Sequence, residues 1–592
     1  MERLPTELIG NIISRLGPAR DVVIASTTRK QWRDAFCCHL PTLSLNSKDR
    51  PSSYGISQFE TEISTTLSQI ERLQGLSISM DEIDEFSAPG VISRLMHSRE
   101  TLRSLFYNVR TTSNVNILVI YERSKLETLF LAHNSITGVN PNYQGFSWLK
   151  SLSLKYVSIS ALDLSLLLTA CPKIEILDLA NLEIAMSDTQ DKVELRSPTL
   201  KSISVEGISL DEFILEADSL ERLHLKYCQL KLIKLVGKGT LKQLVIDDVT
   251  SNDVTSMDEI GEFSAFDVIS WLMHSRETLR SLFYNVRTTS NVNILVIYER
   301  SKLETLFLAH NSITGVNPNY QGFSLLKSLS LKYVSISALD LSLLLTACPK
   351  IEILDLVNLE RAMSDTQDKV ELRSPTLKSI CVEQISLDEF ILEADSLERL
   401  HLKDCDLMLI KLVGKGTLKQ LVIDGVTSIH FDIGVTLENL EVVDIYDFTI
   451  IWPQFYKMIS RSSKLRRLRL WDVLFDDKNE IVDLETFAVC FPQLSHLSLW
   501  YVYLRDGVHY ALAGSSHLEN VIEMELGWTT INELFPYWVV GLVKRCPNLR
   551  KLVIHGEDMD SEETEECMRL TSLIKHFMDD KYEHVEVQLA YQ

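Results

Sequence analysis

A short apolar pattern returns along most of the chain. Leucine or isoleucine occupies the first, fourth and sixth places of segments such as Leu126–Leu131, Leu149–Leu154 and Ile174–Leu179. Successive units lie roughly 20 to 26 residues apart, a spacing typical of repeat proteins. Because side chains alternate between the two faces of a strand, the fourth and sixth residues point to one side and the intervening residues to the other. The pattern therefore predicts a series of short strands with one buried face each.

The segments between these strands include predicted helices. Leu164–Thr169 is apolar and is followed by Cys171 and Pro172, and proline ends a helix because it cannot continue the hydrogen bonding. The same order returns at Cys348 and Cys546. We interpret these three cysteines as small buried residues at helix ends rather than as reactive thiols.

Period and pattern together resemble leucine-rich repeats. The resemblance implies an α/β solenoid, a horseshoe with parallel strands on its concave face and helices or irregular segments on its convex face.

A second, longer period overlies the first. Residues 80–251 recur at 257–428 without a gap and with only about a dozen replacements, so that Met80 corresponds to Met257 at an offset of 177 residues. The block is either a tandem duplication or a fusion of two neighbouring gene copies. Since a solenoid is held by contacts between neighbouring repeats, an inserted block lengthens it without requiring a new function.

Some replacements between the copies are clustered. They change Tyr227, Gln229 and Lys231 to Asp404, Asp406 and Met408, whereas the leucine positions are kept. We interpret this as drift at exposed sites, with specialisation of a binding surface as the alternative.

The first forty residues carry a different pattern. Pro5 suits the start of a helix, and Leu8, Ile9, Ile12, Ile13 and Leu16 then follow at helical spacing up to Gly17 and Pro18. A second apolar set spans Val22–Ala25, and a third segment contains Trp32 and Phe36. Three short helices enclose little core, so part of this apolar surface is expected to face the next domain or a partner protein.

The N-terminal residues resemble an F-box of the plant type. The resemblance is carried by Leu4-Pro5-x-Glu7-Leu8-Ile9-x-x-Ile12-Ile13-Ser14-x-Leu16, Ala19-Arg20-Asp21-Val22-Val23 and Lys30-x-Trp32-Arg33. The chain departs from the family at Thr28-Arg29, where Val-Cys is usual before the basic residue. The resemblance implies docking onto a Skp-type adaptor, which bridges to cullin and RING subunits. The implied apolar contacts are Leu4, Pro5, Leu8, Ile12, Leu16, Val22, Val23 and Trp32. The alternative is a helical cap that shields the end of the solenoid.

The expected organisation follows from these patterns. We assign residues 1–45 to the F-box and 46–592 to the solenoid, with the blocks 80–251 and 257–428 inside it and 429–592 as C-terminal repeats and cap.

Four aromatic residues near the later strands are either recognition anchors or packing residues: Trp471, Trp500, Tyr501 and Tyr503. The acidic run 557–566 is predicted as a loop, and 585–589 as a closing strand.

Composition narrows the class of partner. A net charge of -22 and a pI near 5.2 argue against nucleic acid, because binding to phosphate rests on clustered Lys and Arg. No apolar run is long enough for a membrane span. The ten cysteines lack metal-ligand spacing and are interpreted as reduced thiols of a protein in the cytoplasm, the nucleus or both.

No motif indicates catalysis or a cofactor. Gly237-Lys238-Gly239-Thr240 lacks the upstream glycine of a phosphate-binding loop, and neither His-Glu-x-x-His nor Gly-x-Ser-x-Gly occurs. His224 and its copy His401 are interpreted as polar residues of the concave face rather than ligands. We therefore predict a protein that is not an enzyme and needs neither a metal nor another cofactor.

These observations favour a substrate-recognition subunit of a cullin-type ubiquitin ligase, which acts by proximity alone. The concave residues that are candidates for target binding are Phe130, Lys155, Asp178, Arg222, His224 and Lys226. The acidic chain favours a neutral or basic target surface. One alternative is a hormone-like co-receptor, although its F-box relatives hold an inositol polyphosphate on a basic floor that is not visible in this sequence. Another is a scaffold that works without the ligase.

Overall fold

The computed structural model of the 592-residue chain describes most of the sequence. The described residues are 4–16, 19–49, 55–80, 85–113, 115–139, 145–184, 192–237, 239–250, 269, 272–273, 275–286, 294–316, 322–361, 369–426, 430–433, 437–475, 477, 481–501, 503–504, 507–508, 510–511, 514–528, 533–556 and 561–591. The chain divides into two compact units, Met1–Ile297 and Tyr298–Gln592.

The first unit begins with three short helices, as the apolar spacing predicts. They are α1 (Thr6–Ile13), followed by the 3₁₀ turn η1 (Ser14–Leu16), α2 (Ala19–Thr27) and α3 (Lys30–His39). Pro5 stands directly before α1, whose buried side chains are Ile9 and Ile13. Gly17 and Pro18, the predicted end of the first helix, lie outside the described residues.

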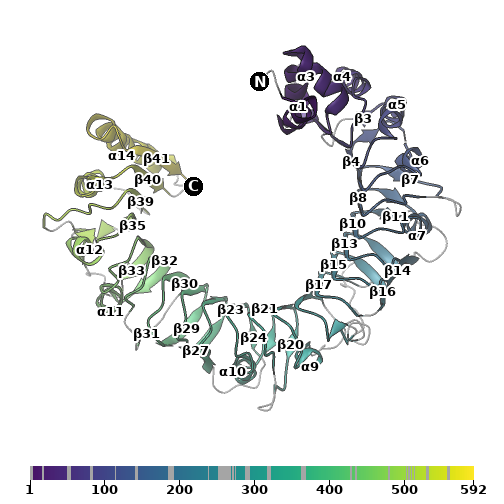
Figure 1. Ribbon diagram of the computed structural model, residues 1–592. Coiled ribbons are helices and arrows are strands. Elements are labelled where there is room, and N and C mark those ends of the chain that lie inside the picture. The colour runs from purple at the N-terminus through teal and green to yellow at the C-terminus, as the bar shows by residue number, and fades with distance from the viewer. Residues whose placement is uncertain are drawn as a thin grey trace. The chain divides into compact units, whose positions relative to one another are not determined.

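The predicted short strands form a parallel sheet in the first unit, here called its inner sheet. In pairing order its strands are β1 (Thr42–Asn46), β2 (Gly75–Ser79), β4 (Ser104–Asn108), β6 (Thr128–Ala132), β8 (Ser151–Lys155), β10 (Ile176–Ala180), β13 (Ser202–Glu206), β15 (Arg222–Lys226), β17 (Gln243–Asp247) and β18 (Ser281–Asn285). Figure 1 shows these strands along the inner side of the unit and the helices along its outer side.

The outer side of the first unit combines helices with small sheets. The helices are α4 (Ile56–Ser68), α5 (Ala88–Ser98), α6 (Ile117–Tyr121) and α7 (Ala161–Thr169). The small sheets comprise β3 (Glu85–Phe86) with β5 (Arg110–Thr111); β7 (Ser135–Ile136), β9 (Ser158–Ile159) and β11 (Glu183–Ile184); and β12 (Lys192–Arg196), β14 (Ser209–Glu216) and β16 (Gln229–Val236).

The second unit has the same construction. Its inner sheet contains β19 (Thr305–Ala309), β21 (Ser328–Lys332), β23 (Ile353–Val357), β26 (Ser379–Glu383), β28 (Arg399–Lys403), β30 (Gln420–Val426), β32 (Val442–Ile450), β33 (Arg467–Phe475), β35 (His496–Tyr501), β39 (Glu523–Trp528), β40 (Lys551–Gly556) and β41 (Glu586–Tyr591), all paired in parallel. The predicted closing strand is confirmed by β41.

The outer elements of the second unit again alternate between helices and small sheets. The helices are α10 (Ala338–Thr346), α11 (Trp452–Ile459), α12 (Glu485–Cys490), α13 (Leu534–Arg545) and α14 (Ser561–Lys581), and α9 (Ile294–Tyr298) spans the division between the units. The small sheets comprise β20 (Ser312–Ile313), β22 (Ser335–Ile336) and β24 (Glu360–Arg361); β25 (Lys369–Arg373), β27 (Ser386–Glu393), β29 (Asp406–Val413) and β31 (His430–Ile433); β34 (Val482–Asp483) with β38 (Tyr510–Ala511); and β36 (Tyr503–Leu504) with β37 (Gly507–Val508).

Leucines in register form the core of each inner sheet. Leu129, Leu152 and Leu177 lie opposite one another on β6, β8 and β10, and all three are fully buried. Burial of one leucine side chain stabilises the fold by about 1.5–3 kcal/mol. In a solenoid the covering surface comes from the neighbouring repeats, so a single repeat alone does not gain this stabilisation. This confirms the parallel-strand solenoid predicted from the repeated pattern.

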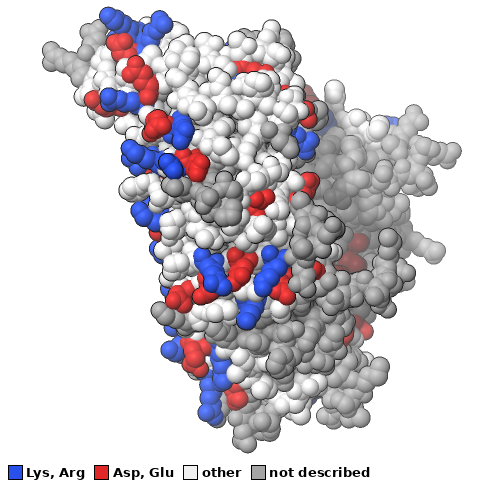
Figure 2. Space-filling view, turned by 90° about the vertical axis from the view of Figure 1, so that its right-hand side faces the viewer, with Lys and Arg blue, Asp and Glu red and all other residues white. Residues whose placement is uncertain are grey.

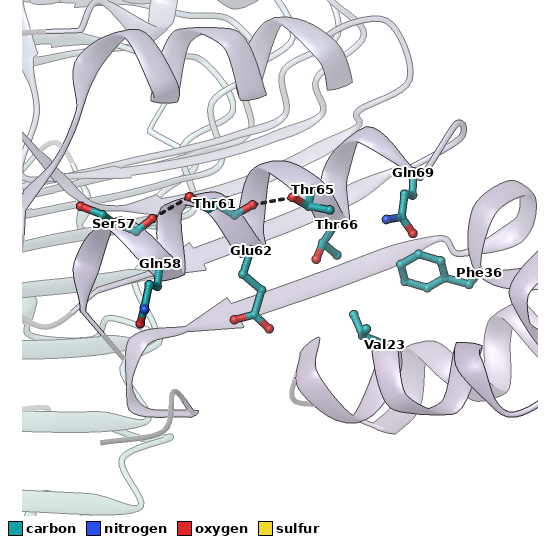
Figure 3. A pocket seen from close by; sticks show the side chains of 9 residues that line it. All are labelled: Val23, Phe36, Ser57, Gln58, Thr61, Glu62, Thr65, Thr66 and Gln69. Carbon is teal, nitrogen blue, oxygen red and sulfur yellow. Dashed lines mark hydrogen bonds between the residues drawn. The ribbon is translucent and has the colours of Figure 1, made fainter. Parts of the chain in front are cut away.

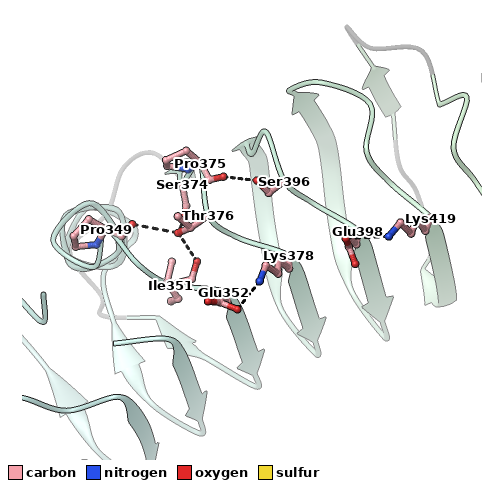
Figure 4. Close-up of polar contacts among 10 residues, drawn as sticks. All are labelled: Pro349, Ile351, Glu352, Ser374, Pro375, Thr376, Lys378, Ser396, Glu398 and Lys419. Carbon is pink, nitrogen blue, oxygen red and sulfur yellow. Dashed lines mark hydrogen bonds and ion pairs between the residues drawn. The ribbon is translucent and has the colours of Figure 1, made fainter. Parts of the chain in front are cut away.

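Polar contacts between successive repeats hold the turns that precede the strands (Figure 4). The Thr376 hydroxyl donates to the carbonyls of Ile351 at 2.7 Å and Pro349 at 3.2 Å. Lys378 forms an ion pair with Glu352 at 2.7 Å, one repeat earlier. The turn residues of one repeat are thus tied to the previous repeat as well as to their own strand.

Two features differ from the sequence prediction. The outer sheets β12–β14–β16 and β25–β27–β29–β31 occupy places where helices or irregular segments were expected. The repeats there start at Leu200, Leu220 and Leu241, only 20 and 21 residues apart. A strand advances about 3.3 Å per residue against 1.5 Å for a helix, so a short repeat can return as a strand. Residues 561–566 of the predicted acidic loop belong to α14 instead.

Candidate functional site

An apolar stripe lies on the surface of the N-terminal helices. Leu8, Ile12 and Leu16 are 49%, 44% and 41% exposed, respectively. They follow one another at intervals of four residues along α1 and η1, so they share one side, while Ile9 and Ile13 point into the core. The helix therefore buries one apolar side within the chain and leaves a second one uncovered among the described residues.

The other residues implied by the F-box resemblance lie at different depths. Pro5 is exposed, and Leu4, Val23 and Trp32 are half-buried. The Leu4 carbonyl accepts a hydrogen bond from the Gln31 side chain at 2.8 Å, which ties the start of the chain to α3. Val22 is only 1% exposed and packs in the core between the helices. We therefore correct its expected role from a surface contact to a core residue.

Thr28 and Arg29, where the sequence departs from the family pattern, form the turn between α2 and α3. The Thr28 hydroxyl donates to the Ala25 carbonyl at 2.7 Å, and the Arg29 carbonyl accepts from the backbone N–H of Trp32 and of Arg33 at 3.1 Å. These two residues thus close one helix and open the next, and the helical arrangement is kept.

A cleft of about 720 Å³ separates the N-terminal helices from α4 (Figure 3). Val23 of α2 and Phe36 of α3 lie on one side, and polar residues of α4 and the residue after it line the other: Ser57, Gln58, Thr61, Glu62, Thr65, Thr66 and Gln69. Among the described residues that line the cleft, Glu62 is the only charged one. These residues include no lysine or arginine that would hold an inositol polyphosphate.

The residues predicted to bind a target all reach the inner face of the first unit. Phe130, Asp178 and His224 occupy the middle of β6, β10 and β15, and Arg222, Lys226 and Lys155 stand at strand ends. From β6 to β15 there are four strand intervals, which span about 19 Å at the usual strand separation. The structure thus places these six residues on one face but not in one pocket.

Several of these side chains have partners on neighbouring strands. The Phe130 ring stacks on Phe106 with centroids 4.1 Å apart. The Ser153 hydroxyl donates to Asp178 at 3.1 Å, and Lys226 lies 3.9 Å from an Asp247 oxygen. Phe106, which sequence reasoning missed, has the same middle position as Phe130 in its strand and could have been found from that register.

His224 belongs to no group of metal-ligating side chains among the described residues. Burial lowers its pKa, with a smaller opposing effect of Gln243 and further lowering by Lys226. In the described part of the chain, His, Cys, Asp and Glu form no group of three or more that could hold a metal ion.

The second unit contains a cluster that sequence reasoning described only in part. Trp471 and Trp500 are 8% and 5% exposed, with ring centroids 4.8 Å apart. Arg469 lies over the Trp471 ring at 4.8 Å and reaches Glu525 at 3.2 Å. Between anchors and packing residues, the structure therefore favours packing for the two tryptophans. The side chains of Tyr501 and Tyr503 lie outside the described residues.

The charges on the visible outer face are mixed. Figure 2 shows basic and acidic side chains mostly next to one another rather than gathered by sign. Opposite charges also pair in the ion pairs of Lys150 with Glu127 and of Lys201 with Glu175, both at 2.8 Å. Among the helices of the described residues, none is long and apolar enough to cross a membrane.

Comparison with known proteins finds relatives along the whole sequence. A family model of the leucine-rich repeats of an FBD-associated F-box protein matches residues 119–238 and 276–419. An F-box/LRR-repeat protein of Arabidopsis thaliana is 40% identical over 595 residues, covering 100% of each chain. An F-box protein of the same plant is 24% identical over 314 residues, which cover 49% of this chain and 71% of that protein. The similarity thus includes the N-terminal helices as well as the repeats.

Proposed function

Because the chain belongs to the F-box/LRR-repeat family, we propose that it is the substrate-recognition adaptor of an SCF-type (Skp–cullin–F-box) ubiquitin ligase. In this proposal the N-terminal helices bind a Skp-type adaptor, which connects to the cullin and RING subunits. The repeats bind a target protein, which is then ubiquitinated and degraded by the proteasome.

The uncovered apolar stripe of Leu8, Ile12 and Leu16 carries the adaptor half of the proposal. Covering each of these side chains would contribute up to about 1.5–3 kcal/mol, and three on one side form a contiguous contact. A cap for the solenoid needs only the opposite side of the helix, where Ile9 and Ile13 already pack. The second apolar side therefore favours a partner protein over a cap.

The inner face of the repeats supports the target half. It presents aromatic and charged side chains at the positions between the buried leucines, including Phe130 and Lys155. The contribution of this chain to ubiquitin transfer would be proximity, because a bound target meets the charged enzyme at a raised effective concentration. The chemical groups for the transfer would come from the other subunits.

The same proposal places the protein in the cytoplasm, the nucleus or both. Burial raises the pKa of the Cys171 and Cys348 thiols to about 12, which keeps them protonated and unreactive. Such thiols suit a reducing compartment. A fluorescently tagged chain expressed in plant cells checks this, and accumulation in the secretory pathway would contradict it.

Affinity capture from plant cells with the proteasome inhibited tests the two halves separately. The wild-type chain should bring down the Skp-type adaptor, the cullin and a set of targets. Ile12→Glu places a charge in the apolar stripe and should lose adaptor and cullin by at least about tenfold while it keeps the targets. Capture of adaptor and cullin by the variant at wild-type level would contradict the proposal.

A further inference from the structure

The same group of four side chains occurs once in each unit. We call it the aromatic–lysine cluster: Phe130, His133, Lys155 and Tyr156 in the first unit, and Phe307, His310, Lys332 and Tyr333 in the second. Each group comes from two adjacent inner strands and the turn residue that follows each of them, β6 and β8 or β19 and β21.

The two clusters have nearly identical geometry. The His133 and Tyr156 rings are stacked with centroids 5.0 Å apart, and His310 and Tyr333 are stacked at 4.9 Å. Lys155 Nζ lies 5.3 Å from the centre of the Tyr156 ring, and Lys332 Nζ lies 5.5 Å from that of Tyr333. Both units thus present a lysine over an aromatic rim.

The turn after each strand brings these rings to the rim of the inner face. His133 and Tyr156 have φ angles of 54° and 51°, and His310 and Tyr333 have 50° and 51°. This left-handed conformation is uncommon for residues other than glycine. The chain turns directly after the strand, and the ring of Tyr156 or Tyr333 lies beside the lysine that precedes it.

The lysines of the clusters differ from other lysines at the same strand position. Lys226 lies 3.9 Å from Asp247, and Lys403 forms a 2.8 Å ion pair with Glu383. Among the described residues, neither Lys155 nor Lys332 has a carboxylate within ion-pair distance. Their neighbours across the sheet are small apolar residues, Ala132 and Ala180 for Lys155.

A lysine without a counter-ion next to an aromatic surface is complementary to a carboxylate beside an apolar group. Phe130 and Lys155 are diagonal neighbours on adjacent strands, one strand apart and two residues along. Diagonal neighbours are about 7–8 Å apart, close to the spacing of residues i and i+2 on one face of an extended segment. An extended peptide could therefore place its apolar side chain on the phenylalanine and its carboxylate on the lysine.

We propose that each aromatic–lysine cluster binds an extended segment of a partner protein in which an apolar residue is followed two positions later by Asp or Glu. This inference rests on the proposed role of the inner face as target receptor. It gives the chain two equivalent sites, Phe130 with Lys155 and Phe307 with Lys332.

Photo-crosslinking of the full chain tests the proposal. The probe is a peptide of serine and glycine that carries benzoylphenylalanine at the apolar position and Glu two residues later, and a second probe carries Lys in place of Glu. Trypsin releases residues 126–150 and 303–327, which contain Phe130 and Phe307 and differ only at Trp148 and Leu325. Mass spectrometry therefore reports labelling of each site separately.

The wild-type chain should be labelled in both peptides by the Glu probe, and at least about fivefold less by the Lys probe. Lys155→Glu should remove labelling of residues 126–150 alone, and Lys332→Glu that of 303–327 alone. Lys350→Glu is a control with the same charge change at an exposed turn outside the clusters.

The proposal would be overturned if neither peptide is labelled at about 1 mM probe. It would also be overturned if Lys155→Glu and Lys332→Glu leave the labelling unchanged. Labelling of one peptide alone would overturn the claim of two sites. Binding of the Skp-type adaptor to the same preparation separates these failures from a failure of the proposed function, because it depends on the N-terminal helices.

Discussion

Gly527 illustrates how a single residue shapes the inner face of the second unit. A Cβ atom on this glycine would overlap the Trp500 ring and come within 3.1 Å of the Trp471 ring. Its absence lets both rings lie against the sheet beside Arg469 and Glu525. The tryptophans were recognisable in the sequence as interface or packing residues, but the glycine that accommodates them was not, because it lies 27 residues beyond Trp500.

Gly527→Ala should therefore lower the free energy of unfolding by about 1–3 kcal/mol, since the ring must move away from a packed position. Urea denaturation followed by tryptophan fluorescence measures the change. Gly55→Ala is the control, because nothing lies within 4 Å of its added Cβ. Since Gly55 is the N-cap of α4, the substitution should lower stability only by the capping cost, about 0.5–1 kcal/mol. An equal effect of the two substitutions would contradict this account of the cluster.

His224 should make stability depend on pH. Burial is the main cause that lowers its folded pKa, so the folded state binds fewer protons than the unfolded state, in which histidine titrates near 6.5. The stability is fully present above that pH and is lost as the pH falls through the folded pKa. Between about pH 7.5 and pH 5.5 the wild type should therefore lose more unfolding free energy than His224→Gln. His97→Gln, at an exposed histidine, serves as the control; an identical pH profile for wild type and His224→Gln would refute the argument.

At the scale of elements, the sequence predicted the inner strands well and the outer segments less well. The leucine spacing determines the buried face of strands such as Leu152–Leu154, and the order of apolar residues before Cys171 and Pro172 correctly predicted α7. The outer strands β14 and β16 were missed because a short apolar run fits either a helix or a strand. The length of the repeat, rather than its residues, decides between the two.

The sequence identified the candidate site only as a set of positions. Leu8, Ile12 and Leu16 were expected from helical spacing, but Val22 shares that apolar character and lies in the core. Which side of a short helix is covered depends on the two other helices, so spacing alone could not separate Val22 from the exposed residues.

The helices α7 and α10 are copies of each other and begin with the same N-terminal capping hydrogen bond, so its contribution to stability can be measured in both. The Ser160 and Ser337 hydroxyls each accept a hydrogen bond from the backbone N–H three residues later, of Asp163 and Asp340, at 3.0 Å. Ser160→Ala and Ser337→Ala should each lower unfolding free energy by about 1 kcal/mol. Thermal or urea unfolding tests this, and a clear effect of only one substitution would show that the two copies are not equivalent.

At the scale of the whole molecule, charged residues before the inner strands alternate in sign from repeat to repeat. In the first copy the row is Arg103, Glu127, Lys150, Glu175, Lys201, Glu221 and Lys242, and in the second it is Arg280, Glu304, Lys327, Glu352, Lys378, Glu398 and Lys419, followed by Glu441. Neighbours form ion pairs, such as Lys242 with Glu221 at 2.7 Å. Each copy contributes seven of these positions, so a row that begins with a basic residue also ends with one. Two basic residues, Lys242 and Arg280, are therefore neighbours where the copies join.

Deletion of residues 252–428 would remove this mismatch, because Lys242 would then precede Glu441 as Lys419 does now. Since repeats contact only their neighbours, the shortened chain should fold and bind the Skp-type adaptor within about twofold of the full chain. Circular dichroism and calorimetry measure both properties. Aggregation or loss of adaptor binding would show that the duplicated block is required.

The proposed adaptor role requires the uncovered side of the first helix to be a docking surface. Size exclusion with light scattering of purified full-length chain mixed with a Skp-type adaptor measures this binding. We expect a one-to-one complex that is lost with Leu8→Glu and kept with Leu162→Glu, which changes a leucine of α7 that is 68% exposed. Separate elution of the wild-type chain and the adaptor, or an intact complex with Leu8→Glu, would contradict it.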